Sequence, residues 1–143
     1  MIRFMGSIRV EIDIDAHPDE VWDALLDFGA VHERLAPGFV VDCRVEEDTR
    51  VVTFFSGAVA RERLVAADDD ARRLVYTVVD GSLPLTHHSA SAQVIPSGND
   101  GSRFVWITDL LPDEFAPVVR EYMDRGIRVI KQQLDRPSRV TRT

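Results

Sequence analysis

The sequence predicts an α+β domain in which an antiparallel sheet of seven strands clasps one long helix. Three observations indicate this fold class. Residues 113–135 have one amphipathic pattern of helical period, residues 39–110 consist of short alternating segments typical of strands, and residues 7–36 add one strand and two short helices. Because one long helix follows all the strands, the sheet has to hold it against one face, and a cavity can remain between them.

Length and charge limit the classes of function. The chain has 143 residues and no internal repeat or linker, so we expect one domain over residues 1–143 with a flexible tail at residues 136–143. The net charge of −7 argues against nucleic acid as a partner, because phosphate binding needs clustered Lys and Arg. No apolar stretch approaches the ~20 residues that a membrane span needs.

The expected compartment follows from the cysteine count and the first residues. Cys43 is the single cysteine, so no disulfide can form within the chain. The first residues lack the apolar core of a signal peptide. We therefore expect a protein of the reducing cytoplasm, and a homodimer stays open as its assembly state.

The first strand is predicted over residues 7–15, where apolar and polar side chains alternate strictly. A helix follows from Pro18, which suits the first helical position, and the two acidic residues after it complement the positive end of the helix dipole. Gly29 is predicted to stop this helix. Residues 30–36 then predict a second, shorter helix, which a Pro-Gly pair ends.

Six further strands are predicted, and short connections make them antiparallel. They cover residues 39–46, 51–55, 58–66, 73–79, 86–95 and 104–110. Counting with period two assigns Cys43 to the inner face with Val41 and Val45, as a small buried hydrophobe. The run around Phe54 and Phe55 lacks clean alternation, so which of the two faces the interior stays open.

The last helix is predicted over residues 113–135, with Asp113 as its N-cap and Pro117 in its first turn. Its inner face contains Gly126, which costs about 1 kcal/mol relative to alanine in a helix interior. This cost indicates that a close strand or a ligand needs the room. Ala90 also points inward and would widen the same space.

The segment Pro18-Asp19-Glu20-Val21-Trp22 and the order of the elements resemble those of the START-like superfamily, in its polyketide cyclase/dehydratase and lipid-transport branch. The resemblance covers nearly the whole chain. It departs at Leu35-Ala36-Pro37, where many relatives carry a Trp shortly before the Pro. The resemblance implies a helix-grip fold, in which the sheet wraps the C-terminal helix around a cavity. Relatives bind lipids, polyketides, sterols or plant hormones, and some catalyse cyclisation or dehydration.

Glu62 and His88 are the candidate acid–base residues. Glu62 lies between small and apolar neighbours on an inner face, where a carboxylate can act as an acid or base. His88 is the inward member of an adjacent histidine pair, and the two side chains point to opposite faces and cannot share a metal. Each has a structural alternative: Glu62 pairs with an arginine at the cavity rim, and His88 is a hydrogen-bonded core residue.

Aromatic side chains with polar tips suit an apolar pocket that needs a few orienting groups. The candidate ligand-binding residues are Tyr76, Trp106, Thr108, Tyr122, Gly126 and Ala90. Core packing is the alternative role for each aromatic residue. The sequence has neither a phosphate-binding glycine loop nor a metal-ligand spacing, so we expect no metal and no cofactor.

Three functions remain open. The first is binding of an apolar small molecule, such as a lipid, a polyketide or an aromatic metabolite. The second is a cyclase or dehydratase that uses Glu62 and His88, so whether the chain is an enzyme is undecided. The third is an interaction module with a collapsed core and no ligand. A cavity that these side chains line together would argue against the third function.

Overall fold

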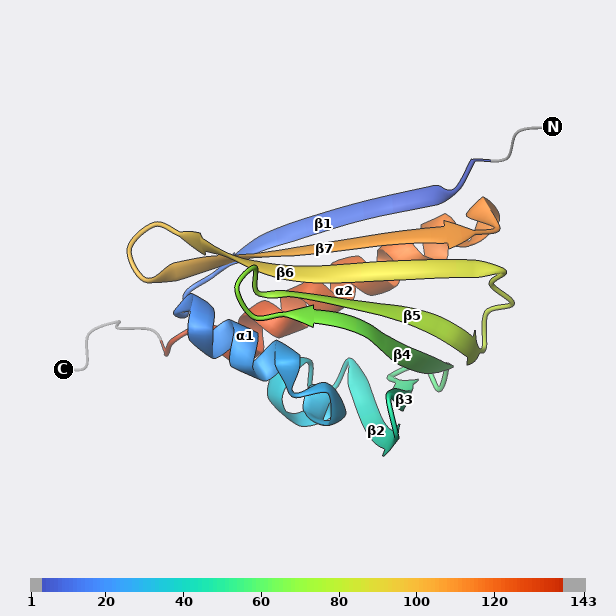
Figure 1. The fold of residues 1–143 in the computed structure, drawn as a ribbon, viewed down its shortest axis with the longest axis horizontal. Coiled ribbons are helices and arrows are strands. Elements are labelled where there is room, and N and C mark those ends of the chain that lie inside the picture. The colour runs from blue at the N-terminus through green and yellow to red at the C-terminus, as the bar shows by residue number, and fades with distance from the viewer. Residues whose placement is uncertain (1–3, 138–143) are drawn as a thin grey trace.

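The computed structural model describes residues 4–137 and confirms the predicted α+β fold. Seven strands form one antiparallel sheet in the order β1-β7-β6-β5-β4-β3-β2. They are β1 (Gly6–Ile14), β2 (Val40–Glu46), β3 (Thr49–Phe54), β4 (Val59–Asp68), β5 (Arg73–Gly81), β6 (His87–Ser97) and β7 (Gly101–Leu111). The long helix α2 (Ala116–Leu134) runs along one face of this sheet (Figure 1).

Short helices follow β1, as predicted. The helix α1 (Pro18–Leu26) has His17 as its N-cap, and the imidazole Nδ1 accepts the Asp19 backbone N–H at 3.2 Å. The second predicted helix is a 3₁₀ turn, η1 (Phe28–Ala30), followed by a π-helical turn, η2 (Val31–Leu35). The first helix therefore ends three residues before Gly29, which lies inside η1 instead of at the helix stop.

The start of the last helix differs from the prediction. A 3₁₀ turn, η3 (Asp113–Phe115), precedes α2, and Phe115 is the N-cap residue in place of Asp113. Proline explains the difference, because an N-cap at Asp113 would put Pro117 where the first intrahelical N–H donor is needed. Starting at Ala116 places Pro117 in the first turn, where no such donor is required.

The end of α2 is tied to the end of β1. The Arg136 backbone N–H donates to the Asp15 carbonyl at 2.8 Å, and the Asp15 N–H donates to Asp135 Oδ1 at 2.8 Å. Arg136 is therefore anchored, although it was assigned to the flexible tail. Pro137 is exposed, and the remaining residues of that predicted tail, 138–143, lie outside the described residues.

The edge strand β2 departs from the predicted alternation. Its pairing with β3 shifts between Val40 and Asp42, so one extra residue interrupts the ladder. Val41 and Val45 are 54% and 52% exposed and Cys43 is only partly buried, so the predicted buried set is wrong. The bulge and the edge position explain this, because α2 packs mainly against β1 and β7, at the opposite edge of the sheet from β2.

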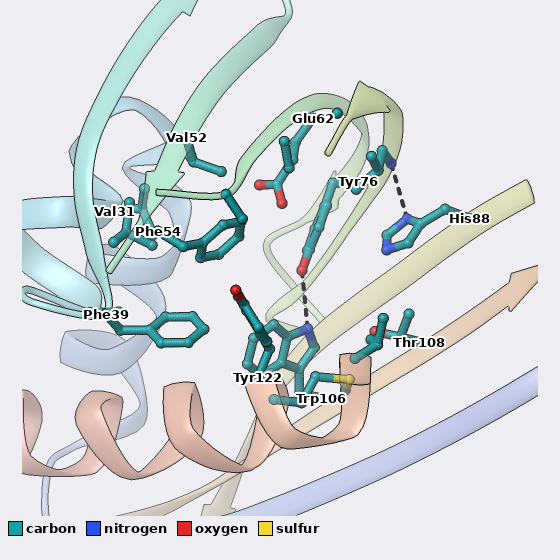
Figure 2. A pocket seen from close by; sticks show the side chains of 18 of the residues that line it. Val31, Phe39, Val52, Phe54, Glu62, Tyr76, His88, Trp106, Thr108 and Tyr122 are labelled. Carbon is teal, nitrogen blue, oxygen red and sulfur yellow. Dashed lines mark hydrogen bonds between the residues drawn. The ribbon is translucent and has the colours of Figure 1, made fainter. Parts of the chain in front are cut away.

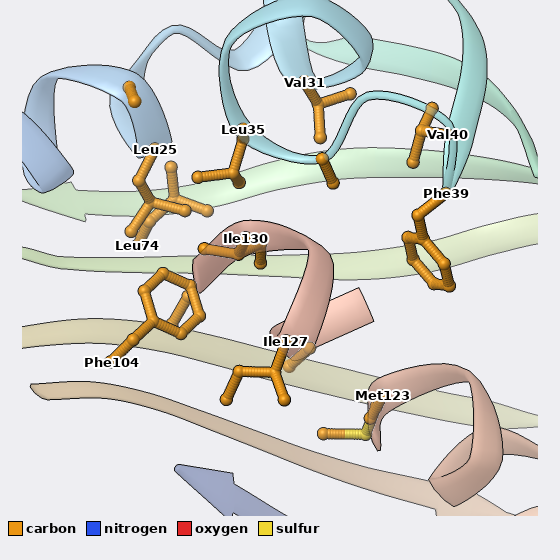
Figure 3. Packing of buried hydrophobic residues seen from close by; sticks show 14 of the residues in the cluster. Leu25, Val31, Leu35, Phe39, Val40, Leu74, Phe104, Met123, Ile127 and Ile130 are labelled. Atoms are coloured by element: carbon orange, nitrogen blue, oxygen red, sulfur yellow. The ribbon is translucent and has the colours of Figure 1, made fainter. Parts of the chain in front are cut away.

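The core lies between α2, η2 and the inner face of the sheet. Figure 3 shows Ile127 and Ile130 of α2 on the side of Phe104 of β7 and Leu74 of β5, with Met123 further along the helix. These side chains are nearly fully buried and hold the helix against the sheet. No helix within residues 4–137 has the length and apolar character needed to cross a bilayer.

Candidate functional site

A cavity of about 200 Å³ lies between the inner face of the sheet and α2 (Figure 2). Strands β3 to β7 form one wall, and η2 and α2 form the other. The lining is mostly apolar and includes Val31, Leu35, Phe39, Val52, Phe54 and Met123. A few polar side chains project between these residues, so the chemistry of the site depends on how they are held.

The cavity brings together most of the residues that the sequence analysis selected. Its lining contains Glu62, Tyr76, His88, Trp106, Thr108 and Tyr122. Ala90 and Gly126 are not part of the lining. Ala90 is buried in β6 opposite Thr108 of β7, and the room at Gly126 is taken by the ring of Phe39, whose Cε2 atom would lie 2.8 Å from an added Cβ.

Glu62 forms a buried ion pair with Arg50. The two residues are directly opposite in the ladder of β3 and β4, so their side chains share the inner face. Arg50 Nε donates to Glu62 Oε1 at 2.8 Å, and both side chains are more than nine-tenths buried. Glu62 therefore has an arginine partner, which is the structural alternative that the sequence analysis kept open, although this pair lies deep in the site.

Arg50 is held on several sides. Its Nη1 donates to the Phe28 carbonyl at 2.9 Å, and its guanidinium lies 3.9 Å from the centroid of the Phe28 ring. The ring of Tyr76 lies at 5.5 Å from the same guanidinium. Sequence reasoning missed Arg50 because it started this strand at residue 51, whereas alternation back from Phe54 through Val52 would have placed Arg50 on the inner face.

Tyr76 and Trp106 form a second polar contact. The Trp106 indole Nε1 donates to the Tyr76 hydroxyl oxygen at 3.1 Å (Figure 2). Burial raises the pKa of the Tyr76 phenol well above its usual value, and the nearby Glu62 carboxylate raises it further. Tyr76 is therefore a neutral hydroxyl at physiological pH.

His88 sits where two strands separate. The β5–β6 ladder ends at the pair Tyr76 and Ala90, and beyond it the Val78 backbone N–H donates to His88 Nδ1 at 3.0 Å. The imidazole thus replaces a backbone acceptor that the ladder no longer provides. Burial lowers the pKa of His88 to about 4, and the adjacent His87 acts in the same direction. His88 is therefore a neutral imidazole at neutral pH.

Aromatic rings gather where β3 turns into β4. The ring of Phe39 lies 5.4 Å from Phe54 and 6.1 Å from Tyr122, and the Tyr122 hydroxyl is bonded to Ser56 at 2.5 Å. The question left open by the sequence is answered here, because Phe54 lines the cavity and Phe55 does not. The Phe55 ring instead packs under the guanidinium of Arg125 at 3.7 Å.

The remaining ionisable groups do not form a metal centre within the part of the chain that the structure describes. Across residues 4–137 no group of three or more His, Cys, Asp or Glu side chains is placed to hold a metal ion. The acidic turn that contains Asp69 has a structural contact instead, because Asp69 Oδ1 accepts the Trp22 Nε1 hydrogen at 2.9 Å. The cavity is thus the candidate site.

Comparison with known proteins agrees with this geometry. Residues 5–136 match the family model described as polyketide cyclase/dehydrase and lipid transport. Among solved structures, XoxI from Bacillus cereus has a TM-score of 0.81 at 20% identity, over 91% of this chain and 96% of that one. A truncated norcoclaurine synthase from Thalictrum flavum has a TM-score of 0.72 at 17% identity, over 96% and 99% of the two chains.

A START superfamily protein from Mycobacterium smegmatis is a further structural relative. It has a TM-score of 0.67 at 13% identity, over 90% of this chain and 98% of that one. At these identities the likeness shows a shared fold alone. No curated protein matches this sequence.

Proposed function

The chain belongs to the polyketide cyclase/dehydrase and lipid transport family, and from this premise we propose that it binds a hydrophobic small molecule in the cavity between the sheet and α2. The observation that carries the proposal is the cavity itself. It has a mostly apolar lining with a few convergent polar groups, which is the usual chemistry of a small-molecule site. Membership of a family described by polyketide cyclisation and lipid transport supports the same class of function.

The energetic cost of the cavity supports this proposal. Large-to-small substitutions in protein cores lose about 24 cal/mol per Å³ of cavity, so a dry cavity of about 200 Å³ corresponds to roughly 5 kcal/mol. Domains are typically stable by only about 5–15 kcal/mol. A cost of that size is easier to understand if a ligand fills the space and offsets it.

The volume also bears on the kind of ligand. Drug-sized ligands occupy pockets of roughly 300–1,000 Å³, and this cavity is smaller. An engineered apolar cavity of about 150 Å³ holds benzene. We therefore favour a compact aromatic metabolite or polyketide fragment over a full-length lipid. We also keep the cytoplasm as the expected compartment, because the chain has a single cysteine.

A cyclase or dehydratase that uses Glu62 and His88 is the second candidate. The observation in its favour is that both residues line the same cavity as Tyr76. Two contacts weaken it, because Glu62 is paired with Arg50 and His88 Nδ1 accepts a backbone N–H. An imidazole with a pKa of about 4 is also a weak base at neutral pH. The ligand-free module is the least favoured, since it predicts a filled core.

Native mass spectrometry of the protein purified from its source organism tests the proposal. We expect a bound species of defined mass that organic extraction releases. The variant Ala60→Leu adds a larger side chain to the cavity wall and should lose that species. The control is Ala66→Leu, the same substitution on the same strand at an exposed position. If both variants retain the species as the wild type does, the ligand is bound elsewhere and the proposal is wrong.

A further inference from the structure

We propose that the cavity selects an uncharged ligand whose carbonyl-type oxygen accepts hydrogen bonds from Tyr76 and His88, and that it discriminates against the matching carboxylate. The inference rests on the proposed binding function and specifies the chemistry of the ligand's polar end. Three features of the site support it: a hydroxyl whose proton is free, an imidazole whose tautomer is defined by its partner, and a buried cation whose charge is already balanced.

The hydrogen-bonding role of the Tyr76 hydroxyl is defined by its neighbour Trp106. A tryptophan indole can only donate a hydrogen bond, so the Tyr76 oxygen is the acceptor in its contact with Trp106. Its own proton then has no acceptor among residues 4–137. Figure 2 shows this hydroxyl at the centre of the site, between Trp106 and the side chains of β3 and β4. Tyr76 can therefore donate one hydrogen bond to a ligand.

The His88 ring has a defined tautomer. Its Nδ1 accepts the Val78 backbone N–H, so in the neutral ring the proton is on Nε2. Figure 2 shows the edge of the ring that carries Nε2 turned toward the interior, on the same side as the Tyr76 hydroxyl. The centroids of the two rings are 5.9 Å apart. His88 is thus a second neutral donor beside the first, and a carbonyl oxygen with two lone pairs matches such a pair.

The charge of the lining is balanced. Arg50 and Glu62 are the basic and acidic residues of the lining, and they form an ion pair with each other. The guanidinium is further occupied by the Phe28 carbonyl and ring. A carboxylate ligand would therefore give up its hydration without meeting a free cation, and it would also face the Glu62 carboxylate. A ketone, ester or amide loses far less hydration and gains two donors.

Three probes that share one benzene ring test this inference. Acetophenone has a neutral carbonyl, ethylbenzene lacks the oxygen, and benzoate is an anion at neutral pH. Isothermal titration calorimetry should show that acetophenone binds roughly ten-fold more tightly than ethylbenzene, because only the ketone uses the two donors. Benzoate should bind at least about ten-fold more weakly than acetophenone, because its charge is not compensated.

Two variants separate the contribution of the Tyr76 donor from that of the Arg50–Glu62 charge balance. Tyr76→Phe keeps the ring and removes the donor, so the preference for acetophenone over ethylbenzene should fall to about two-fold. Glu62→Gln keeps the shape of the side chain and leaves the Arg50 charge without its carboxylate, so benzoate affinity should rise by about ten-fold or more. The matched control is Glu46→Gln, which removes the carboxylate of an exposed pair with Arg61 and should change no affinity.

The outcomes are distinct. Equal affinity of the wild type for benzoate and acetophenone overturns the selection against charge. Equal affinity for acetophenone and ethylbenzene overturns the assignment of Tyr76 and His88 as donors. In both cases acetophenone still binds, so the proposed function stands. Failure of all three probes to bind overturns the proposed function together with the inference. A gain of benzoate binding in Glu62→Gln supports the inference, and it also shows that the variant is folded.

Discussion

Arg50 and Glu62 face each other across neighbouring strands, and each makes the burial of the other tolerable. A buried charge without a partner costs several kcal/mol of stability. A buried ion pair, by contrast, often contributes about as much stability as apolar residues of similar size would. The pair therefore matters less as a source of stability than as a constraint. If either partner is lost, the remaining charge must be hydrated or the strands must move.

We predict that Glu62→Gln destabilises the protein by about 3 kcal/mol, at the lower end of the range for broken buried pairs because the Phe28 carbonyl still contacts Arg50. The double variant Arg50→Met with Glu62→Leu should lose much less free energy of unfolding than Glu62→Gln does, since no charge then remains buried. Urea unfolding of the wild type, Glu62→Gln, the two single variants Arg50→Met and Glu62→Leu, and their double variant measures this. A double variant as unstable as the sum of the singles would contradict the prediction.

His88 links the site to pH. Its folded-state pKa of about 4 lies below the ordinary value of 6.5, because burial disfavours the charged ring. As pH falls below about 6.5, the unfolded state takes up a proton that the folded state binds only near pH 4. Stability therefore decreases as pH falls through this window, by up to about 3 kcal/mol from this residue.

We predict that His88→Asn has a weaker pH dependence of stability between about pH 6.5 and 4 than the wild type. The asparagine side-chain oxygen can accept the Val78 N–H in place of Nδ1, so the backbone contact is kept. Thermal unfolding at a series of pH values measures the difference. The control is His87→Asn at the exposed neighbouring position, which should retain most of the wild-type slope, because burial is the main cause of the lowered His88 pKa and His87 only adds to it. Equal slopes for His88→Asn and the wild type would sink this assignment.

At the scale of elements, α2 closely approaches Phe39, the residue before β2, through a glycine. The Phe39 ring occupies the space beside Gly126, and a Cβ there would lie 2.8 Å from Cε2 and 3.0 Å from Cζ. Phe39 cannot move aside freely, because Phe54, Phe55 and Tyr122 surround its ring at centroid distances of 5.4, 5.9 and 6.1 Å. Close packing of helix on sheet thus explains a glycine that helix propensity alone disfavours.

We predict that Gly126→Ala destabilises the protein by roughly 1–2 kcal/mol, because overpacking outweighs the gain in helix propensity. Adding Phe39→Leu shortens the opposing side chain, so the cost of Gly126→Ala should shrink or change sign in that background. Chemical denaturation of the four proteins gives the coupling energy. Additive effects of the two substitutions would show that the contact does not limit the approach of the helix.

At the scale of the whole molecule, the cavity sets a trade-off between stability and binding. An apolar space that is empty in the free protein lowers its stability, and a ligand that fills the space raises stability by mass action. Substitutions that fill the cavity should therefore stabilise the free protein and remove the response to ligand. These two effects distinguish a binding site from a packing defect. Filling a packing defect stabilises the protein but removes no response to ligand.

We predict that Ala60→Leu raises the stability of the free protein by up to about 1 kcal/mol while it abolishes ligand-dependent stabilisation. In the wild type, an acetophenone concentration of one hundred times Kd should stabilise by about 2.7 kcal/mol. Differential scanning fluorimetry with and without the probe checks both values. A wild-type response that persists in Ala60→Leu would place the bound probe outside the cavity.

The sequence alone predicts the order of the elements, the antiparallel sheet and the long helix, because hydrophobic periodicity and turn residues are local signals. It also identified Glu62, Tyr76, His88, Trp106, Thr108 and Tyr122 as inward residues of the wall. These positions follow from alternation within a single strand or helix, and they need no knowledge of the neighbouring element.

The contacts that these side chains make could not be predicted in this way, because they depend on tertiary packing. The pairing of Arg50 with Glu62 depends on the register of two strands, and His88 meets the Val78 N–H because the β5–β6 ladder ends there. The bulge in β2 and the Phe39 ring beside Gly126 are equally non-local. A periodic pattern shows which way a side chain points, but the partner it meets and the volume that remains depend on how distant segments pack.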